Sequence, residues 1–151
     1  MKFRFVWVGK TRNRNWKALQ EEYLERLSRF VSCEIKEARD GEGRDRIETE
    51  GNRIIEILNP KSFAVLLDVS GSCVSSTDLA DRLKKWENSG AKEISFVIGG
   101  AEGVSAAVAE RADDRLSLSF LTFTHEMARV VLLEQLYRAY TILRGYPYHN
   151  E

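Results

Sequence analysis

Apolar and polar positions along the chain predict strands and helices in regular succession. Short runs rich in β-branched and aromatic residues predict five strands, over Phe3–Val8, Cys33–Glu37, Phe63–Val69, Ile94–Ile98 and Leu116–Ser119. Segments with helical spacing alternate with them, over Trp16–Phe30, Arg44–Leu58, Thr77–Asn88, Ser105–Ala112 and His125–Leu143. This alternation is typical of α/β proteins, so we predict a mainly parallel sheet flanked by helices.

The loops contain clear stop signals but no linker long enough to separate two domains. Asn59-Pro60 and Ser89-Gly90 end two of the predicted helices. A chain of 151 residues suits one domain that buries about two thirds of its unfolded surface. We therefore expect a single domain over residues 1–151, with the charged, glycine-containing segment 39–46 as its most mobile loop.

Composition excludes several classes of protein. The two cysteines, Cys33 and Cys73, lack the spacing of a metal site, so we expect neither a metal nor a disulfide and favour a reducing cytoplasm. No apolar run approaches the roughly 20 residues that a membrane span requires. We therefore expect a soluble protein with no membrane partner.

Basic residues are unevenly distributed although the net charge is zero, with 23 basic and 23 acidic side chains. One acid-free stretch carries Lys10, Arg12, Arg14 and Lys17 around the aromatic Trp16. Such a stretch can neutralise RNA phosphates, and a solvated surface loop is the alternative. The neutral total favours a structured substrate, or one met inside a larger assembly, over tight non-specific RNA binding.

A glycine-rich segment, IGGAEG at Ile98–Gly103, directly follows the fourth predicted strand. Glycines let backbone amides approach a ligand closely, so this is a candidate binding loop, with an ordinary strand-to-helix turn as the alternative. The segment lacks the GxGxxG pattern of dinucleotide-binding proteins, and no Gly-Lys-Ser/Thr of a P-loop occurs in the chain. A nucleotide-using dehydrogenase is therefore disfavoured.

This segment belongs to a set of separated blocks that together resemble the RlmH family. The other blocks are FRFVWVGK, YLERLSRF, LTFTHEMAR, LEQLYRA and the terminal PYHNE, in the same order over the whole length. The resemblance implies a SPOUT-class fold with a C-terminal trefoil knot. It also implies a homodimer that uses S-adenosylmethionine (SAM) to methylate N3 of a pseudouridine in 23S ribosomal RNA, on the assembled 70S ribosome.

The resemblance implies a SAM site built from three segments. Its expected residues are Leu67, Gly99, Gly100, Gly103, Ser119, Phe120, Leu121, Thr122, Phe123 and Thr124. Two positions depart from the family pattern, since Ala101 and Thr124 stand where proline is usual. We expect SAM binding to survive the change at Ala101 because the glycines remain, whereas the change at Thr124 bears on the conformation of the 119–124 loop.

The resemblance also implies that the C-terminal tail reaches an active site. His149 is the first candidate for proton acceptor or positioning hydrogen bond, and Tyr148 for contact with the base. We expect Arg129 to bind a phosphate or base edge and Glu134 to orient a neighbour, although pairing of Glu134 with Arg138 at i,i+4 is the structural alternative. His125 joins the expected RNA contacts, with a helix-capping or packing role as its alternative.

The last predicted helix carries apolar residues on more than one face, which indicates burial on more than one side. A subunit contact is one explanation, and the resemblance favours it. Cys73 lies outside every matching block, so a nitrogen target fits better than carbon methylation by a cysteine nucleophile. The competing hypothesis is a non-catalytic RNA-binding or ribosome-associated module that keeps the fold.

Overall fold

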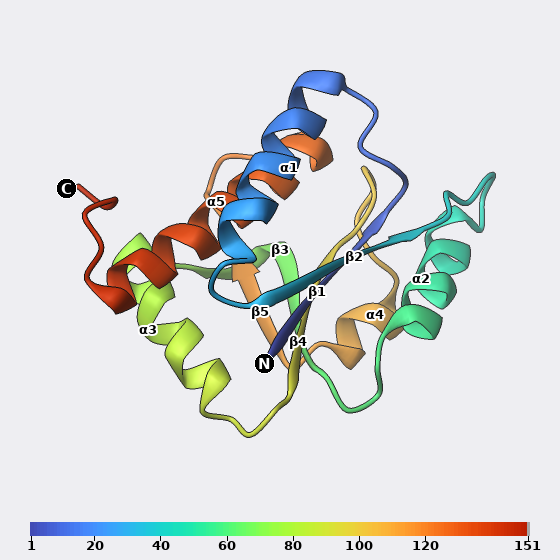
Figure 1. The fold of residues 1–151 in the computed structure, drawn as a ribbon. Helices are drawn as coiled ribbons and strands as arrows, with labels where there is room; N and C mark the ends of the chain where they lie inside the picture. Colours follow the sequence, from blue (N-terminus) through green and yellow to red (C-terminus); the bar gives the residue numbers. More distant parts are fainter. Residues whose placement is uncertain (151) are drawn as a thin grey trace.

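The computed structural model describes residues 1–150 and contains one five-stranded sheet with helices on both faces (Figure 1). The strands are β1 (Lys2–Val8), β2 (Ser32–Ala38), β3 (Phe63–Cys73), β4 (Glu93–Ile98) and β5 (Asp114–Ser117). The helices are α1 (Arg14–Leu27), α2 (Arg46–Ile57), α3 (Ser76–Glu87), α4 (Ala106–Arg111) and α5 (His125–Arg144). All strand pairs are parallel, in the order β2-β1-β4-β3-β5. The predicted α/β class is confirmed.

The two faces of the sheet bury two separate apolar clusters. Phe3, Phe5 and Trp7 of β1 point toward α1, α3 and α5, whereas Val6 and Val8 point toward α2 and α4. Successive side chains of a strand face opposite sides, so a strand buried on both faces is apolar almost throughout. The β-branched and aromatic runs in the sequence follow from this two-sided burial.

The predicted element boundaries need small corrections, and the largest of them concern β3 and β5. β5 begins at Asp114, two residues before the predicted Leu116. β3 continues to Cys73, past the predicted Val69, because its register with β5 shifts between Leu67 and Ser72. This irregularity between β3 and β5 lies beside a cavity at the ends of these strands.

Hydrogen-bonding side chains set the helix starts. Asn13, Ser75, Ser105 and Thr124 each accept a backbone N–H from the first turn of the helix that follows. Gly145 ends α5 with a φ of 70°, a left-handed conformation that glycine adopts without strain. The C-terminal tail therefore turns sharply after α5.

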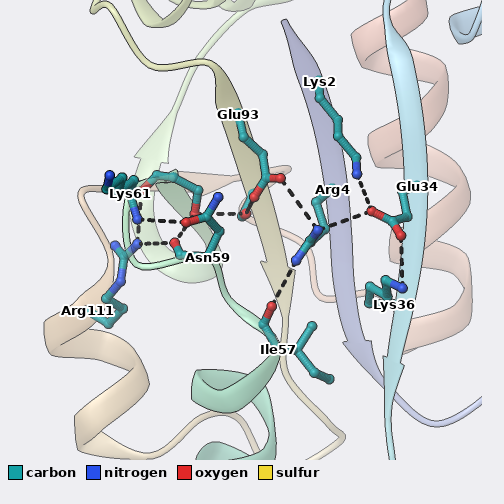
Figure 2. A network of polar contacts seen from close by, with 11 residues as sticks. Lys2, Arg4, Glu34, Lys36, Ile57, Asn59, Lys61, Glu93 and Arg111 are labelled. Atoms are coloured by element: carbon teal, nitrogen blue, oxygen red, sulfur yellow. Dashed lines mark hydrogen bonds and ion pairs between the residues drawn. The ribbon is translucent and has the colours of Figure 1, made fainter.

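A network of charged side chains joins β2, β1 and β4 near the amino ends of these strands (Figure 2). Arg4 lies between Glu34 of β2 and Glu93 of β4, and it also donates a hydrogen bond to the Ile57 carbonyl. Hydrogen bonds from Lys2 and Lys36 lower the pKa of the Glu34 carboxyl to about 2. The network joins three neighbouring strands and the end of α2. No helix in residues 1–150 is long and apolar enough to cross a membrane.

Candidate active site

A cavity of about 530 Å³ opens at the carboxyl ends of β3, β4 and β5. Ligands of open parallel sheets bind at this edge, because the loops that follow the strands meet there. Its walls come from the end of β3, the glycine loop after β4, the loop after β5 and the start of α5. The lining residues include Leu67, Asp68, Val69, Gly99, Gly100, Gly103, Ser119, Leu121, Thr122, Phe123, His125 and Ala128.

The glycine loop forms a tight turn against this cavity. The Gly103 N–H donates a hydrogen bond to the Gly100 carbonyl at 3.1 Å, and Gly103 has a φ of 94° that disfavours other residues. A Cβ on Gly100 would point to Glu50 and Val8, neither of which lines the cavity. Gly100 therefore makes room behind the loop, whereas the sequence suggested that it makes room for the ligand.

The loop after β5 closes the opposite wall. Its predicted residues line the cavity except Phe120, whose side chain is 93% exposed, and Thr124, which caps α5 by accepting a hydrogen bond from the Met127 N–H. Val69 and Leu121 are also strongly exposed at the cavity rim. Apolar side chains gathered at a rim in this way mark a surface that contacts a ligand or a partner.

The basic segment lies at the same edge of the sheet, in the loop between β1 and α1 and in the first turn of α1. Lys10, Arg12, Arg14 and Lys17 are all exposed. Glu126, on the first turn of α5, accepts hydrogen bonds from the backbone N–H groups of Arg12 and Asn13. The first turn of α5 thus contacts the basic loop through Glu126 and the cavity through His125 and Ala128.

The C-terminal tail folds back on α5 and forms a second polar cluster. Glu134 Oε1 accepts hydrogen bonds from Tyr148 Oη at 3.0 Å and from Arg138 Nη2 at 2.6 Å. Arg138 Nη1 lies 3.2 Å from His149 Nδ1, and its guanidinium also lies over the Tyr148 ring, 4.9 Å from the centroid. Tyr137 packs edge-on against that ring. The tail therefore holds a tyrosine and a histidine in a defined arrangement.

Burial raises the pKa of the Tyr148 hydroxyl above its ordinary value, and hydrogen bonding to Tyr23 and the nearby Glu134 carboxylate act in the same direction. The hydroxyl is therefore protonated at neutral pH and donates to Glu134. Hydrogen bonds from Arg138 to Glu134 raise the pKa of the arginine, which keeps its charge. An arginine has only donors, so Arg138 donates in its contact with His149 Nδ1.

The cavity and the tail cluster lie at different heights along α5. His125, at the cavity, begins the helix, and Arg138, which contacts His149, follows thirteen residues later. At 1.5 Å per residue these positions are about 20 Å apart along the helix axis. The tail of one chain therefore lies far from the cavity of that chain.

The whole chain matches one family of known proteins. A family profile described as "Predicted SPOUT methyltransferase" matches residues 1–149. The chain belongs to the SPOUT methyltransferase family. It is 42% identical over 153 residues to the ribosomal RNA large subunit methyltransferase H of Geotalea daltonii, with 99% of this chain and 100% of the relative covered. It is 44% identical to the protein of that name from Geobacter metallireducens, with 99% of each covered. The resemblance to the RlmH family is confirmed.

A solved structure supports the fold of this SPOUT methyltransferase. A Legionella pneumophila protein, described as a methyltransferase in complex with SAM, superposes with a TM-score of 0.51 at 13% identity. The match covers 90% of this chain and 65% of that protein. At this identity the likeness concerns the fold alone.

One predicted RNA contact of this SPOUT methyltransferase needs correction. Arg129 is 0% exposed, and it donates hydrogen bonds to the Val8 carbonyl and the Thr11 hydroxyl. Its guanidinium lies 4.8 Å from the centre of the Trp7 ring. Arg129 therefore joins β1 and the basic loop to α5 from inside the protein, where no RNA oxygen reaches it. Burial lowers its pKa to about 10.

Sequence reasoning missed Arg138 as a site residue and treated it only as the structural partner of Glu134. In the structure Arg138 forms the i,i+4 ion pair with Glu134 and also contacts the candidate residues Tyr148 and His149. Tyr148, His149 and Glu134 thus lie together, whereas Arg129 lies elsewhere. The signal that could have identified Arg138 was its i,i+4 spacing from Glu134 in the LEQLYRA block, since Glu134 was already a candidate.

Proposed function

We propose that this chain transfers the methyl group of SAM to N3 of a pseudouridine in 23S ribosomal RNA, on the assembled 70S ribosome in the cytoplasm. The observation that carries the proposal is the cavity at the ends of β3, β4 and β5, in a chain that matches large-subunit ribosomal RNA methyltransferases over its full length. The predicted SAM segments supply most of the cavity lining. A C-terminal trefoil knot remains part of the proposal.

The cavity suits SAM in size and chemistry. A volume near 530 Å³ lies within the range of about 300–1,000 Å³ that is usual for small-molecule sites. Leu67 and Leu121 provide apolar walls for an adenine ring, and the glycine loop offers backbone groups at close range. When bound, SAM supplies an electrophilic methyl group on a sulfonium.

Methyl transfer requires the base nitrogen in line with the methyl carbon, and loss of the N3 proton. The N3–CH3 bond forms as the S–CH3 bond breaks, the sulfur keeps the electron pair, and the proton leaves to a base or to water. Positioning supplies most of such a barrier reduction. We assign this task to Tyr148 and His149, with Glu134 and Arg138 holding them.

Arg138 holds the His149 ring at Nδ1, beside the Tyr148 ring. We keep both roles expected from the sequence for His149, a positioning hydrogen bond to the base or acceptance of the N3 proton. Either role requires the defined place that the docked tail gives the imidazole.

The basic loop is the proposed RNA contact outside the cavity. Lys10, Arg12, Arg14 and Lys17 are exposed at the same edge of the sheet as the cavity, and His125 lines the cavity itself. The side chains of the loop suit phosphates of RNA near the target base. Glu126 and Arg129 support the loop from α5.

We further propose a homodimer in which the tail of each subunit completes the cavity of its partner. The separation of about 20 Å along α5 supports this arrangement, as do the exposed apolar residues Val69, Phe120 and Leu121 near the cavity. A partner subunit covering this rim would bury them. Each active site then combines the cavity of one chain with Tyr148 and His149 of the other.

A mixing experiment tests the shared site. Gly100→Val crowds Glu50 and deforms the glycine loop, and His149→Ala leaves the loop intact. Each variant alone should be inactive with ribosomes, and subunit exchange should restore one working site per heterodimer. Persistent inactivity of verified heterodimers would reject sharing.

The catalytic proposal has a separate test, methyl incorporation from labelled SAM into unmodified ribosomes. We expect incorporation into 23S RNA of 70S particles and little into protein-free RNA. SAM binding by titration calorimetry without any methyl incorporation would favour the non-catalytic ribosome-binding module instead.

A further inference from the structure

A buried carboxylate lies behind the glycine loop, on the opposite side from the cavity. Glu50 belongs to α2, which packs beside α4 on one face of the sheet (Figure 1). The residue is only 4% exposed. A charged side chain is rarely buried to this degree unless it is paired or hydrogen-bonded.

One oxygen of this carboxylate is bonded to the segment that precedes α2. Oε2 accepts a hydrogen bond from the Gly41 N–H at 3.0 Å and one from Arg46 Nε at 3.2 Å. Glu50 therefore connects the buried Gly41, in the loop before α2, to α2 itself. This hydrogen bond anchors the segment 39–46, which the sequence predicted to be the most mobile loop.

The other oxygen faces the glycine loop. A Cβ on Gly100 would lie 3.2 Å from Glu50 Oε1, so the carboxylate fills the space behind that residue. Within residues 1–150, Oε1 accepts no hydrogen bond that would hold it in another direction. Glu50 thus supports the start of the turn between Gly100 and Gly103.

The next residue of α2 supports the other end of the same loop. A Cβ on Gly51 would lie 2.2 Å from the hydroxyl oxygen of Ser105, which caps α4. Only glycine permits this approach of α2 to the end of the loop. The Glu102 carboxylate also contributes, after Glu50, to raising the pKa of Arg46, which places opposite charges near each other across the loop.

We propose that Glu50 is a positioning residue for the cofactor: it supports the glycine loop from behind and thereby sets the affinity for SAM. The inference rests on the proposed function, since it assumes that SAM occupies the cavity. Glu50 does not line the cavity, so it acts through Gly100 and makes no contact with the ligand. Its loss should let the loop move away from the conformation that binds SAM.

A cycle of substitutions tests the contact between Glu50 and Gly100, with SAM affinity measured by titration calorimetry. Glu50→Ala should raise the SAM Kd roughly tenfold, and Gly100→Ala should raise it to a similar extent because its Cβ meets Oε1. Gly100→Ala added to Glu50→Ala should cost little more, because the oxygen that it meets is gone. Equal costs of Gly100→Ala in both backgrounds would overturn the proposal.

Further variants separate positioning from general stability. Glu50→Gln keeps the side-chain length and an acceptor for the Gly41 N–H, so it should restore most of the affinity lost in Glu50→Ala. Glu48→Ala, an exposed position on the same helix, is the matched control and should change nothing. In steady-state assays Glu50→Ala should raise the KM for SAM and leave kcat at saturation unchanged.

Two outcomes distinguish failure of this inference from failure of the proposed function. Absence of SAM binding by the unmodified protein contradicts the proposed function and the inference with it. Normal SAM binding by the unmodified protein and by folded Glu50→Ala contradicts the inference alone. If Glu50→Ala fails to fold, Gly100→Ala still tests the contact with every buried hydrogen bond intact, and unchanged SAM affinity in that variant would reject the inference.

Discussion

Removing the hydroxyl of Tyr148 tests whether tail docking contributes to catalysis. Tyr148→Phe deletes the hydrogen bond to Glu134 but keeps the ring between Tyr137 and Arg138. The global fold should be unaffected, because the tail follows the last helix and contributes little to either apolar cluster. The change therefore removes the contacts of the hydroxyl with Glu134 and Tyr23 and leaves the ring contacts of the tail in place.

The magnitude follows from the type of hydrogen bond. A hydrogen bond to a charged group contributes about 1.5–3 kcal/mol, and the lower value applies because Glu134 is partly exposed. About 1.5 kcal/mol corresponds to roughly a tenfold change in the equilibrium between docked and undocked tail. Glu134→Ala removes the acceptor for Tyr148, Arg138 and Gln135 together, so its effect on docking should be larger.

The assay is methyl transfer to unmodified ribosomes with both substrates saturating, beside calorimetric SAM binding. Tyr148→Phe should lower turnover by up to about tenfold and Glu134→Ala by more, with the SAM Kd unchanged in both. Glu22→Ala removes the comparable i,i+4 ion pair with Arg26 on α1 and serves as control. Unchanged turnover in Glu134→Ala, or a parallel loss of SAM affinity, would refute the reasoning.

Three further predictions concern charge and thiol chemistry. Burial raises the pKa of the Cys33 thiol to about 11, so at pH 8 a thiol reagent should modify the exposed Cys73 first and Cys33 much more slowly; equal rates would contradict this burial. The lowered pKa of Glu34 contributes stability that is complete above pH 4.5 and lost as the pH falls toward 2, so denaturation curves of Glu34→Gln should show weaker acid destabilisation over this range than the unmodified protein. Neutralising Arg12 and Arg14 should weaken ribosome binding and flatten its salt dependence without altering SAM affinity, and an unaltered salt slope would return this loop to a purely solvated role.

The sequence predicted the order and type of the elements most clearly where a strand is buried on both faces, as β1 and β4 are. The run Phe3–Val8 is apolar at nearly every position, which is typical of a strand that is buried on both faces. Strand ends were less predictable where tertiary contacts decide them. β5 begins early because Asp114 pairs with Val65 of β3, and β3 extends to Cys73 through a register shift between Leu67 and Ser72; no local pattern encodes either pairing.

The family resemblance indicated the segments that line the cavity, whereas side-chain directions could not be read from the sequence. The glycine loop and most of the 119–124 loop meet at the cavity because each follows the end of a strand. Arg129 has the residue type of an RNA contact, but its place on the helix points it inward to Val8 and Thr11. The burial of Glu50 depends on how α2 packs against the glycine loop, which sequence spacing alone does not specify.

Mapping of the methylated base tests the proposed reaction at its target atom. Ribosomes from cells that lack this protein would be incubated with the purified enzyme and SAM carrying a deuterated methyl group, and the 23S RNA digested for tandem mass spectrometry. We expect one added labelled methyl group, on N3 of a pseudouridine, and none with the Gly100→Val variant. A label on another base or atom, or no label in a preparation that binds SAM, would contradict the proposed reaction.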